Sequence, residues 1–275
     1  MASRKFVLGL SLILGCSAVW AQKGPAVLEM DAEGEVQIAP DGSVSDYRLQ
    51  SKLGSPISDA IDRNVRGWHF QPVVIEGRAV TARTAMHLAL TAEPVEGKTD
   101  SYTLRVSSLR FGEMKVVHVK PPSYPPAAVR AHVGGKVMLA VRLDADGKVA
   151  DVQAYQTSLD ARARSEHEAE LFRKVFEKAA VAAARDWQYD LSERIDGKAV
   201  GMNAMIPVTF NLCNMPCSKP DPEAWRALLP GPVHPAPWMG EQVADNDLST
   251  LGDGQAMPLD SRFRLRDDVI GKKLL

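Results

Sequence analysis

The side chains in this sequence that are most capable of chemistry are its three cysteines. Cys213 and Cys217 are separated by three residues, a spacing that differs from the C-x-x-C of redox centres. In an oxidising compartment such a pair predicts a disulfide. Cys16 ends the stretch Ile13-Leu14-Gly15-Cys16, which has the form of a lipoprotein processing site, so lipidation of Cys16 is one alternative for the N-terminus.

Enzyme chemistry has little support in the sequence. His167 lies between Glu166 and Glu168, but adjacent residues of a helix point to different faces, which indicates a solvated surface. The sequence contains no G-x-S-x-G, H-E-x-x-H or P-loop motif. We therefore expect a protein that is not an enzyme, with no catalytic residue, no metal and no cofactor.

The N-terminal residues 1–21 predict an export signal. Arg4 and Lys5 precede an apolar run over residues 6–15, which is shorter than the roughly 20 residues that span a bilayer. We expect cleavage after Ala21 and a periplasmic protein. The chain is expected to contact a membrane only if Cys16 is lipidated, which would make it an anchored lipoprotein, or if the signal is retained.

The overall composition is that of an ordinary globular protein. The formal net charge is −1 at pH 7, with 24% charged and 45% hydrophobic residues. Lysines and arginines are scattered along the chain instead of forming a basic run. We therefore expect no nucleic-acid partner.

One pattern occurs twice along the chain. Each copy contains an Asp-Gly turn, a Trp-x-aromatic pair and a Gly-basic-Ala-Val turn in the same order. The first copy has them at 41–46, 68–70 and 77–80, and the second at 146–151, 187–189 and 197–200. Such a repeat predicts two related domains. Trp68 and Trp187 are expected to pack in the two cores, because burying a Trp removes about 200 Å² from water.

The periodicity of each copy predicts two strands, a helix and a third strand. In the second copy the strands are expected at 137–143, 149–156 and 201–212, with the helix at 166–187. In the first copy the strands are expected at 34–39, 44–49 and 81–90, with the helix at 57–68. The predicted fold class is α+β: two tandem small domains, each with a helix packed on an antiparallel three-stranded sheet, and a Pro-rich C-terminal tail.

The expected domain boundaries follow from these elements. Residues 22–112 form the first domain, 113–126 a Pro-rich linker, 121–213 the second domain and 214–275 the tail. Residues 101–111 are strand-like and are expected to pair with the first sheet. The tail holds eight of the 18 prolines and a predicted short helix at 222–229. Its aromatic residues Trp225, Trp238 and Phe263 indicate that it docks on the body.

The second copy resembles the C-terminal domain of the TonB family. The shared features are a Tyr-Pro segment, a Gly-x-Val first strand, an Asp-Gly hairpin, a helix ending in Trp-x-Phe/Tyr and a final strand with Pro-Val-x-Phe. They occur in PPSYPPAAVRAHVGGKV (121–137), LDADGKVADVQ (143–153), AAARDWQYD (182–190) and GKAVGMNAMIPVTFNL (197–212). The first copy resembles the family less closely over 34–90. Residues 22–120 do not resemble the family's Pro-rich spacer, and the apolar N-terminal run lacks the histidine of its membrane anchor.

The resemblance implies that the last strand binds a short receptor segment by strand addition. The unpaired backbone N–H and C=O groups of an edge strand would pair with that segment. The candidate partner-binding residues are Gly201, Asn203, Met205, Pro207, Thr209 and Asn211. Pro207 fits two interpretations, an edge that receives a peptide and an edge that is protected from aggregation.

These features support three hypotheses of function. The first is a periplasmic TonB-like interaction module that binds an extended peptide of an envelope or outer-membrane protein. The second is an energy-transducing component of a TonB-type outer-membrane transport system, with an uncleaved N-terminal anchor. The third is a structural envelope protein whose sheet edges are capped by its own segments.

Overall fold

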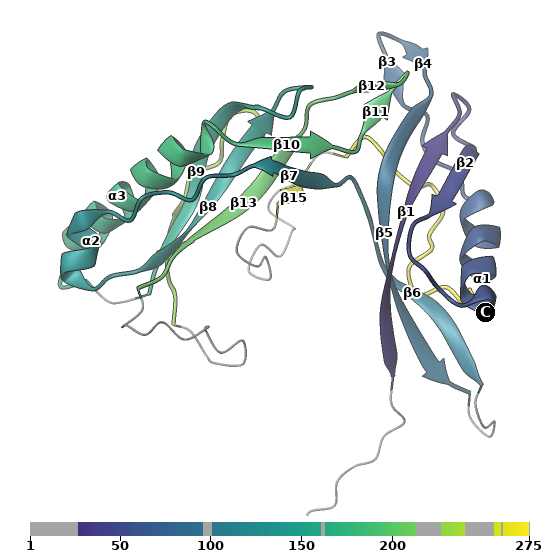
Figure 1. Ribbon diagram of the computed structural model, residues 1–275, viewed down its shortest axis with the longest axis horizontal. Helices are drawn as coiled ribbons and strands as arrows, with labels where there is room; N and C mark the ends of the chain where they lie inside the picture. The colour runs from purple at the N-terminus through teal and green to yellow at the C-terminus, as the bar shows by residue number, and fades with distance from the viewer. Residues whose placement is uncertain are drawn as a thin grey trace, which may run out of the picture.

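The computed structural model describes residues 27–95, 101–160, 163–212, 227–239, 256–259 and 261–274. These residues form an α+β fold with antiparallel sheets, as the sequence predicts (Figure 1). Two large sheets, each with its own hydrophobic core, lie side by side, and one long helix packs against each. The parts of the chain around these two sheets are called the first and the second domain below.

The first domain has a sheet of six strands. Its centre is β1 (Leu28–Ile38), which pairs with β2 (Val44–Leu49) on one side and β5 (Ala82–Pro94) on the other. β6 (Tyr102–Phe111) pairs with β5, which confirms the expected pairing of residues 101–111. The helix α1 (Ser55–Arg66) packs on this sheet. The three predicted strands are therefore present in the sheet, but the sheet has more strands than the three predicted.

The second domain repeats this arrangement with five strands in the order β14-β9-β8-β13-β15. β8 (Gly135–Leu143) lies between β9 (Val149–Leu159) and β13 (Asn203–Phe210), and α3 (Glu166–Ala184) covers one face. The outer strands β14 (Leu229–Val233) and β15 (Met257–Pro258) come from the tail. Here too the predicted three-stranded sheet is the centre of a wider one, because pairing from distant segments leaves no local sequence pattern.

Shorter elements complete the described part of the fold. They are the hairpin β3 (Val74–Ile75) and β4 (Arg78–Ala79), the ribbon β7 (Met114–His118) and β10 (Gln188–Leu191), the pair β11 (Arg194–Ile195) and β12 (Lys198–Ala199), and the helix α2 (Pro126–Ala131). β11 belongs to the second copy of the repeat, yet it pairs with β5 at Ala82 and Arg83. The stretch expected as a linker thus contains a strand and the start of a helix.

Helix ends follow local sequence signals. In α1, Pro56 occupies the first turn, where a missing N–H costs no hydrogen bond. In α3, the Ser165 hydroxyl accepts a hydrogen bond from the backbone N–H of Glu168 at 3.2 Å, a typical N-cap. Both helices end before the Trp that was expected to close them, and Trp68 and Trp187 are instead buried in the two cores, as predicted.

The Asp-Gly turns hold the aromatic pairs in the same way in both domains. The N–H of Phe70 donates to the carbonyl of Gly42 at 2.7 Å, and the N–H of Tyr189 donates to the carbonyl of Gly147 at 2.9 Å. Both glycines have positive φ, at 89° and 73°, which side chains other than hydrogen rarely tolerate. These turns and aromatic residues are therefore scaffold.

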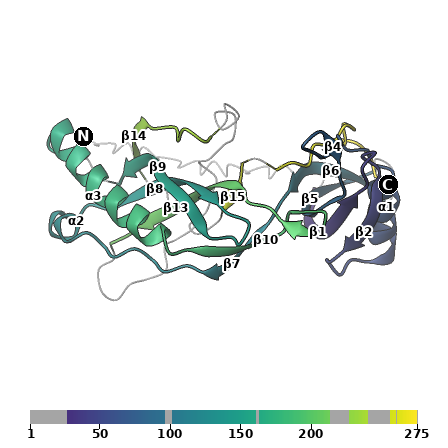
Figure 2. The same ribbon diagram turned by 90° about the horizontal axis from the view of Figure 1, so that it is seen from above.

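The described part of the tail lies along both domains (Figure 2). β14 pairs with β9, and β15 pairs with β13. Further on, Phe263 is buried in the first core, 6.4 Å from the ring of Phe70. The predicted helix at 222–229 falls mostly outside the described residues, and Leu229 begins β14.

Several predictions concern residues that the structure does not describe. The export signal, Cys16, Cys213, Cys217 and Trp225 all lie outside the described ranges. Within those ranges, no helix has the length and apolar character needed to cross a membrane.

Candidate functional site

The strand proposed from sequence as the binding edge, β13, is an inner strand for part of its length. One side pairs with β8 over all of Asn203–Phe210, and the other side pairs with β15 only at Ala204 and Met205. The N–H of Leu259 donates to the carbonyl of Asn203 at 2.9 Å on the β15 side. Because alternate residues of a strand point their backbone groups the same way, Met205, Pro207 and Thr209 face this edge as well.

The first three candidate residues are not free to receive a peptide. Met205 is fully buried beneath the tail, in a cluster with Met138 and Ala236 on the face opposite α3. The carbonyl of Gly201 accepts a hydrogen bond from Nη1 of Arg262 at 3.2 Å. Asn203 is half-buried, and its carbonyl is held by the tail as described above. The tail therefore caps this half of the candidate edge.

The other half of β13 borders an apolar groove. This groove has a volume of about 260 Å³, and β13 contributes Ile206, Pro207, Val208 and Thr209 to its wall. The rest of the wall comes from Val116, Val119, Pro121, Pro122, Trp187 and Tyr189. Pro207 thus lies in the groove, Thr209 beside it is half-buried, and Asn211 is exposed beyond its end. We call this feature the β13 groove.

Packing of the ribbon β7–β10 builds the far wall of the β13 groove. Val116 pairs with Tyr189 across the ribbon, and Nε1 of Trp187 donates to the carbonyl of Lys120 at 2.9 Å. Burial raises the pKa of Tyr189 to about 12, so its hydroxyl is neutral at physiological pH. Val116 itself is 59% exposed, an unusual position for an apolar side chain.

The Tyr-Pro segment anchors this wall to the core. The ring of Tyr124 packs edge-on against Phe176 and Phe210, with centroid distances of 5.9 and 5.6 Å. Its hydroxyl donates to the carbonyl of Val133 at 2.9 Å. Burial raises the pKa of Tyr124 to about 12, so this donor is present at physiological pH. The segment that precedes Tyr124 is thereby fixed along the edge of β13.

Sequence reasoning missed Val116 and Val119. Both fall in the stretch that was expected to be a linker. The signal that could have found them is the apolar run Val116-Val117 directly before the prolines, since a solvated linker is usually polar. The groove that they line offers shape, apolar contact and backbone groups, because none of its lining side chains is a carboxylate, an imidazole, a thiol or an amine.

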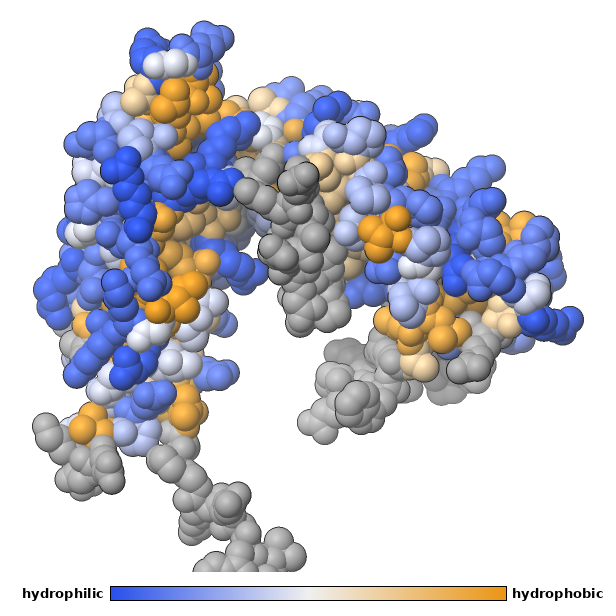
Figure 3. Space-filling view, turned by 180° about the vertical axis from the view of Figure 1, so that it is seen from behind, coloured by the Kyte–Doolittle hydropathy of each residue, from blue (hydrophilic) through white to orange (hydrophobic). Residues whose placement is uncertain are grey.

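The surface opposite the view of Figure 1 is largely hydrophilic, with separate hydrophobic patches over both domains (Figure 3).

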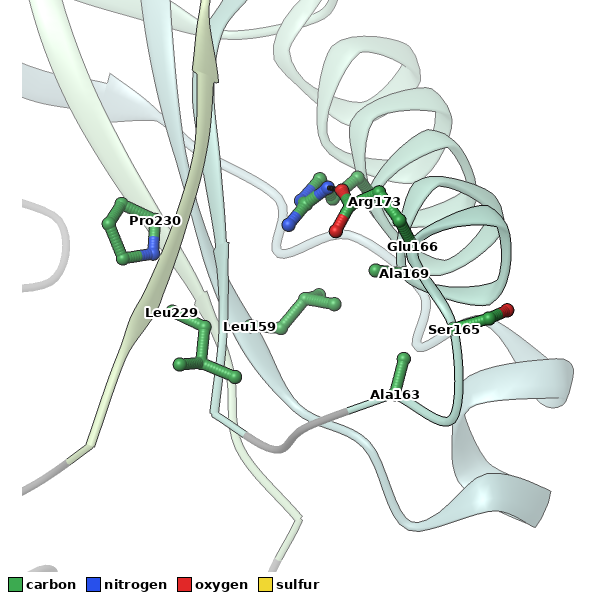
Figure 4. Close-up of a pocket in the computed structure, with 8 residues that line it drawn as sticks. All are labelled: Leu159, Ala163, Ser165, Glu166, Ala169, Arg173, Leu229 and Pro230. Atoms are coloured by element: carbon green, nitrogen blue, oxygen red, sulfur yellow. Dashed lines mark hydrogen bonds and ion pairs between the residues drawn. The ribbon is translucent and has the colours of Figure 1, made fainter.

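A second pocket of about 350 Å³ lies between the end of β9, the start of α3 and β14. Figure 4 shows Arg173 at one side of it, with the Glu166 carboxylate beside its guanidinium. Nη1 of Arg173 is 2.5 Å from Glu166 and 3.9 Å from Glu170. Two carboxylates already balance this buried cation, so the pocket is poorly suited to an anionic ligand.

The edge of the first domain that corresponds to the β13 groove is closed. There, β11 pairs with β5 at Ala82 and Arg83, and β6 pairs with it from Met86 to Pro94. Nearly the whole outer side of β5 is thus used within the chain. Among the described residues, the second domain has an apolar groove beside its third strand.

Comparison with known proteins identifies the second domain. Residues 120–164 match the family model described as Gram-negative bacterial TonB protein C-terminal. Two curated proteins named Protein TonB, from Xanthomonas campestris pv. campestris strains B100 and ATCC 33913, are each 34% identical over 95 residues. The match covers 34% of this chain, and the chain spans only 36% of the length of these relatives. The second domain is therefore similar to the C-terminal domain of TonB proteins.

Proposed function

We propose that this chain is a TonB-like protein-interaction module of the cell envelope, and that its second domain binds an extended segment of an outer-membrane or other envelope protein. The observation that carries the proposal is the β13 groove, an apolar hollow beside a sheet edge that β15 pairs with at Ala204 and Met205. Strand addition uses such an edge for backbone hydrogen bonds and such a hollow for side-chain selection.

The groove and the edge suit an extended ligand for separate reasons. An added strand presents alternate side chains to one face of the sheet. On the α3 face those side chains would meet Ile206 and Val208 of β13, and Trp187 across the groove. Pro207 offers its carbonyl to the ligand but no N–H, so backbone pairing is one hydrogen bond poorer there.

We place the protein in the periplasm, with residues 1–21 removed as an export signal; a lipid on Cys16 is the alternative. The same compartment would allow a disulfide between Cys213 and Cys217. The kinship of the second domain with proteins named TonB supports this location.

Photo-crosslinking in cells tests the proposed function. A photoreactive residue replaces Val116, which lines the groove, or Val117, which is equally exposed at 59% but does not line it. We expect an envelope protein to be trapped from position 116 and not from position 117. Equal adducts from both positions, or none from either, would overturn the proposal.

Two other functions have specific support. The relatives named TonB favour an energy-transducing component whose N-terminal segment stays in the membrane as an anchor. N-terminal sequencing distinguishes this function from the proposed one, because a free N-terminus at Gln22 rules out a retained anchor. The tail strands β14 and β15 favour a structural protein with capped edges. For that protein, position 116 should trap nothing.

A further inference from the structure

The first domain is shorter than the second at one end of its sheet. Its strand β2 has 6 residues, whereas the corresponding strand β9 has 11. Its helix α1 has 12 residues, whereas α3 has 19. The first strands of the two domains are of similar length, with 11 residues in β1 and 9 in β8. The beginning of β1 therefore extends past the end of β2 (Figure 1).

The second domain shows what occupies this place when the chain fills it. Counting from the Asp-Gly turns at 41–42 and 146–147, Met30 corresponds to Gly135. In the second domain β9 continues along β8 to this position, and Leu159 lies opposite Gly135. In the first domain the pairing of β2 ends four residues before Met30, at Gly34. Among the described residues, no strand takes the place of the extra length of β9.

The backbone of β1 presents unpaired groups at this place. The N–H of Gln50 donates to the carbonyl of Glu33 at 2.8 Å, so the backbone groups of Glu33 face the β2 side. Because alternate residues of a strand point their backbone groups the same way, those of Asp31 and Glu29 face this side too. In the described part of the chain, nothing on this side bonds to them. Such an edge can accept one more strand.

The side chains give this edge two different faces. Leu28 and Met30 share the α1 face with the buried Ala32, yet they are 51% and 37% exposed. Glu29 and Asp31 lie on the opposite face and are exposed. Neither carboxylate forms an ion pair with a described residue. We call residues 28–32, with these faces, the β1 edge.

The charges of the β1 edge decide between two kinds of occupant. If a second copy of this chain paired antiparallel about Met30, Glu29 of each copy would lie opposite Asp31 of the other. Like charges directly opposite are destabilising, whereas opposite charges stabilise a strand pair. Acidic side chains thus protect this edge from its own copies, as charges on edge strands commonly do. They favour a segment that brings basic side chains.

We infer that the β1 edge binds an extended segment of a partner protein in which apolar and basic residues alternate, and which runs antiparallel to β1 as β9 runs along β8. Its apolar side chains lie opposite Leu28 and Met30 and cover their exposed surface. Its basic side chains lie opposite Glu29 and Asp31. This site belongs to the first domain and is separate from the β13 groove, so the inference goes beyond the proposed function.

A peptide of simple alternating sequence is the probe. Fluorescent TKVKVKVT is titrated with the full-length chain and followed by anisotropy, and we expect saturable binding. TKKKVVVT has the same composition and charge without the alternation, so it should bind at least fivefold less tightly. TEVEVEVT keeps the alternation but carries acidic residues, and it should not bind. Added salt should weaken the binding of TKVKVKVT, because exposed ion pairs are screened.

Chain variants locate the binding. Asp31→Pro removes an N–H that faces the β1 edge and not β5, so the sheet tolerates it while an added strand loses a donor. It should abolish the binding of TKVKVKVT. Asp31→Asn keeps the N–H and should weaken binding about two- to fivefold. The matched charge control is Asp186→Asn, at an exposed position of the second domain, which should change binding by less than about twofold.

A second pair of variants requires no change of backbone. Met30→Lys places a charge on the apolar face of the β1 edge and should weaken binding at least fivefold. Leu171→Lys, at a 51% exposed position of α3, is its control and should leave binding unchanged.

Four results would each overturn the inference: no binding of TKVKVKVT, equal binding of TKKKVVVT, binding that survives both Asp31→Pro and Met30→Lys, or equal losses for Asp31→Asn and Asp186→Asn. The proposed function is decided separately by crosslinking at position 116, in the second domain.

Discussion

The two domains share one plan but treat the outer edge of the third strand differently. In the first domain the chain itself fills that edge with β11 and β6, and Phe111 completes the core beside Phe70. In the second domain β15 covers two residues and leaves the β13 groove beside the rest. Among the described residues, the outer edge of the third strand is therefore paired along most of its length in the first domain and borders an apolar groove in the second.

This difference distinguishes the residues that hold the fold of both domains from those in which the two domains differ. Turn glycines, buried Trp residues and the helix are common to both domains and hold the fold. The strand that follows β5 in the first domain has no counterpart after β13 among the described residues. The two domains thus differ in whether a strand that directly follows the third strand in sequence pairs with it.

The largest effect should come from Phe70→Ala, in the closed groove. Phe70 is fully buried against Phe111 and Phe263, and truncating such a residue lowers the free energy of unfolding by about 3–5 kcal/mol. Val116→Ala, at the open groove, should lower it by less than about 0.5 kcal/mol. Urea unfolding followed by tryptophan fluorescence measures both. Similar losses for the two variants would mean that the second groove is also part of a core.

Phe111→Ala tests how much the pairing of β6 with β5 stabilises the first domain. We expect a loss of about 2 kcal/mol in the free energy of unfolding, because this side chain is half-buried. Its exposed neighbour Arg110 is the control, and Arg110→Ala should change stability by no more than about 0.5 kcal/mol. If Phe111→Ala lowers the free energy of unfolding no more than Arg110→Ala does, the Phe111 side chain does not stabilise this edge of the first domain.

Met257→Asp tests whether β15 competes with the segment proposed to bind at β13. Met257 packs in the tail cluster on the face opposite α3, and a charge there should detach β15 from Ala204 and Met205. The model ligand is the peptide TLRVSSLRF, which repeats residues 103–111 of β6, the strand that pairs with β5. Extended by two residues beyond its Phe and titrated by fluorescence anisotropy, it should bind the variant about fivefold more tightly, since each added backbone hydrogen bond contributes about 0.5–1.5 kcal/mol. The distant variant Leu171→Asp serves as the control. Unchanged affinity for Met257→Asp would show that β15 does not compete.

Pro207→Ala tests the backbone donor that the proline removes from this edge of β13. His87 occupies the corresponding position of β5, opposite Arg110 of β6, and carries the edge-facing N–H that Pro207 lacks. Restoring this donor should tighten peptide binding by about two- to tenfold. The same titration measures it. Weaker binding of Pro207→Ala would assign to the proline ring a contact with the ligand.

Local sequence patterns were sufficient to predict the central strands and the long helix of each domain. The alternation over 201–212 predicted which side chains of β13 face the core, and Ala204, Ile206 and Val208 lie there. The helix stripes and the Asp-Gly turns were predicted correctly for the same reason, since they depend on residues close in sequence. Neighbouring elements of this kind need no information from distant parts of the chain.

The groove could not be predicted in this way. Its far wall requires β7 to pair with β10, which begins at Gln188, and its partial cover requires β15, which pairs from position 257. Pairing between distant strands has no periodic signal, so Val116 was assigned to a linker, and whether the edge of β13 is free or capped stayed open. The Tyr-Pro segment was recognised, but its role in fixing that wall depends on ring contacts with Phe176 and Phe210.

The most direct measurement is isotope-edited NMR of the full-length chain, labelled at its Ile and Val methyl groups, with the unlabelled peptide TLRVSSLRF. We expect nuclear Overhauser contacts from the ring of the peptide's Phe to the methyl groups of Ile206 and Val116. We also expect contacts from the peptide's final Leu to Val208. Contacts that map instead to the first domain, or a bound peptide with no contact to Ile206, would contradict the claim that β13 receives the strand that β6 supplies to β5.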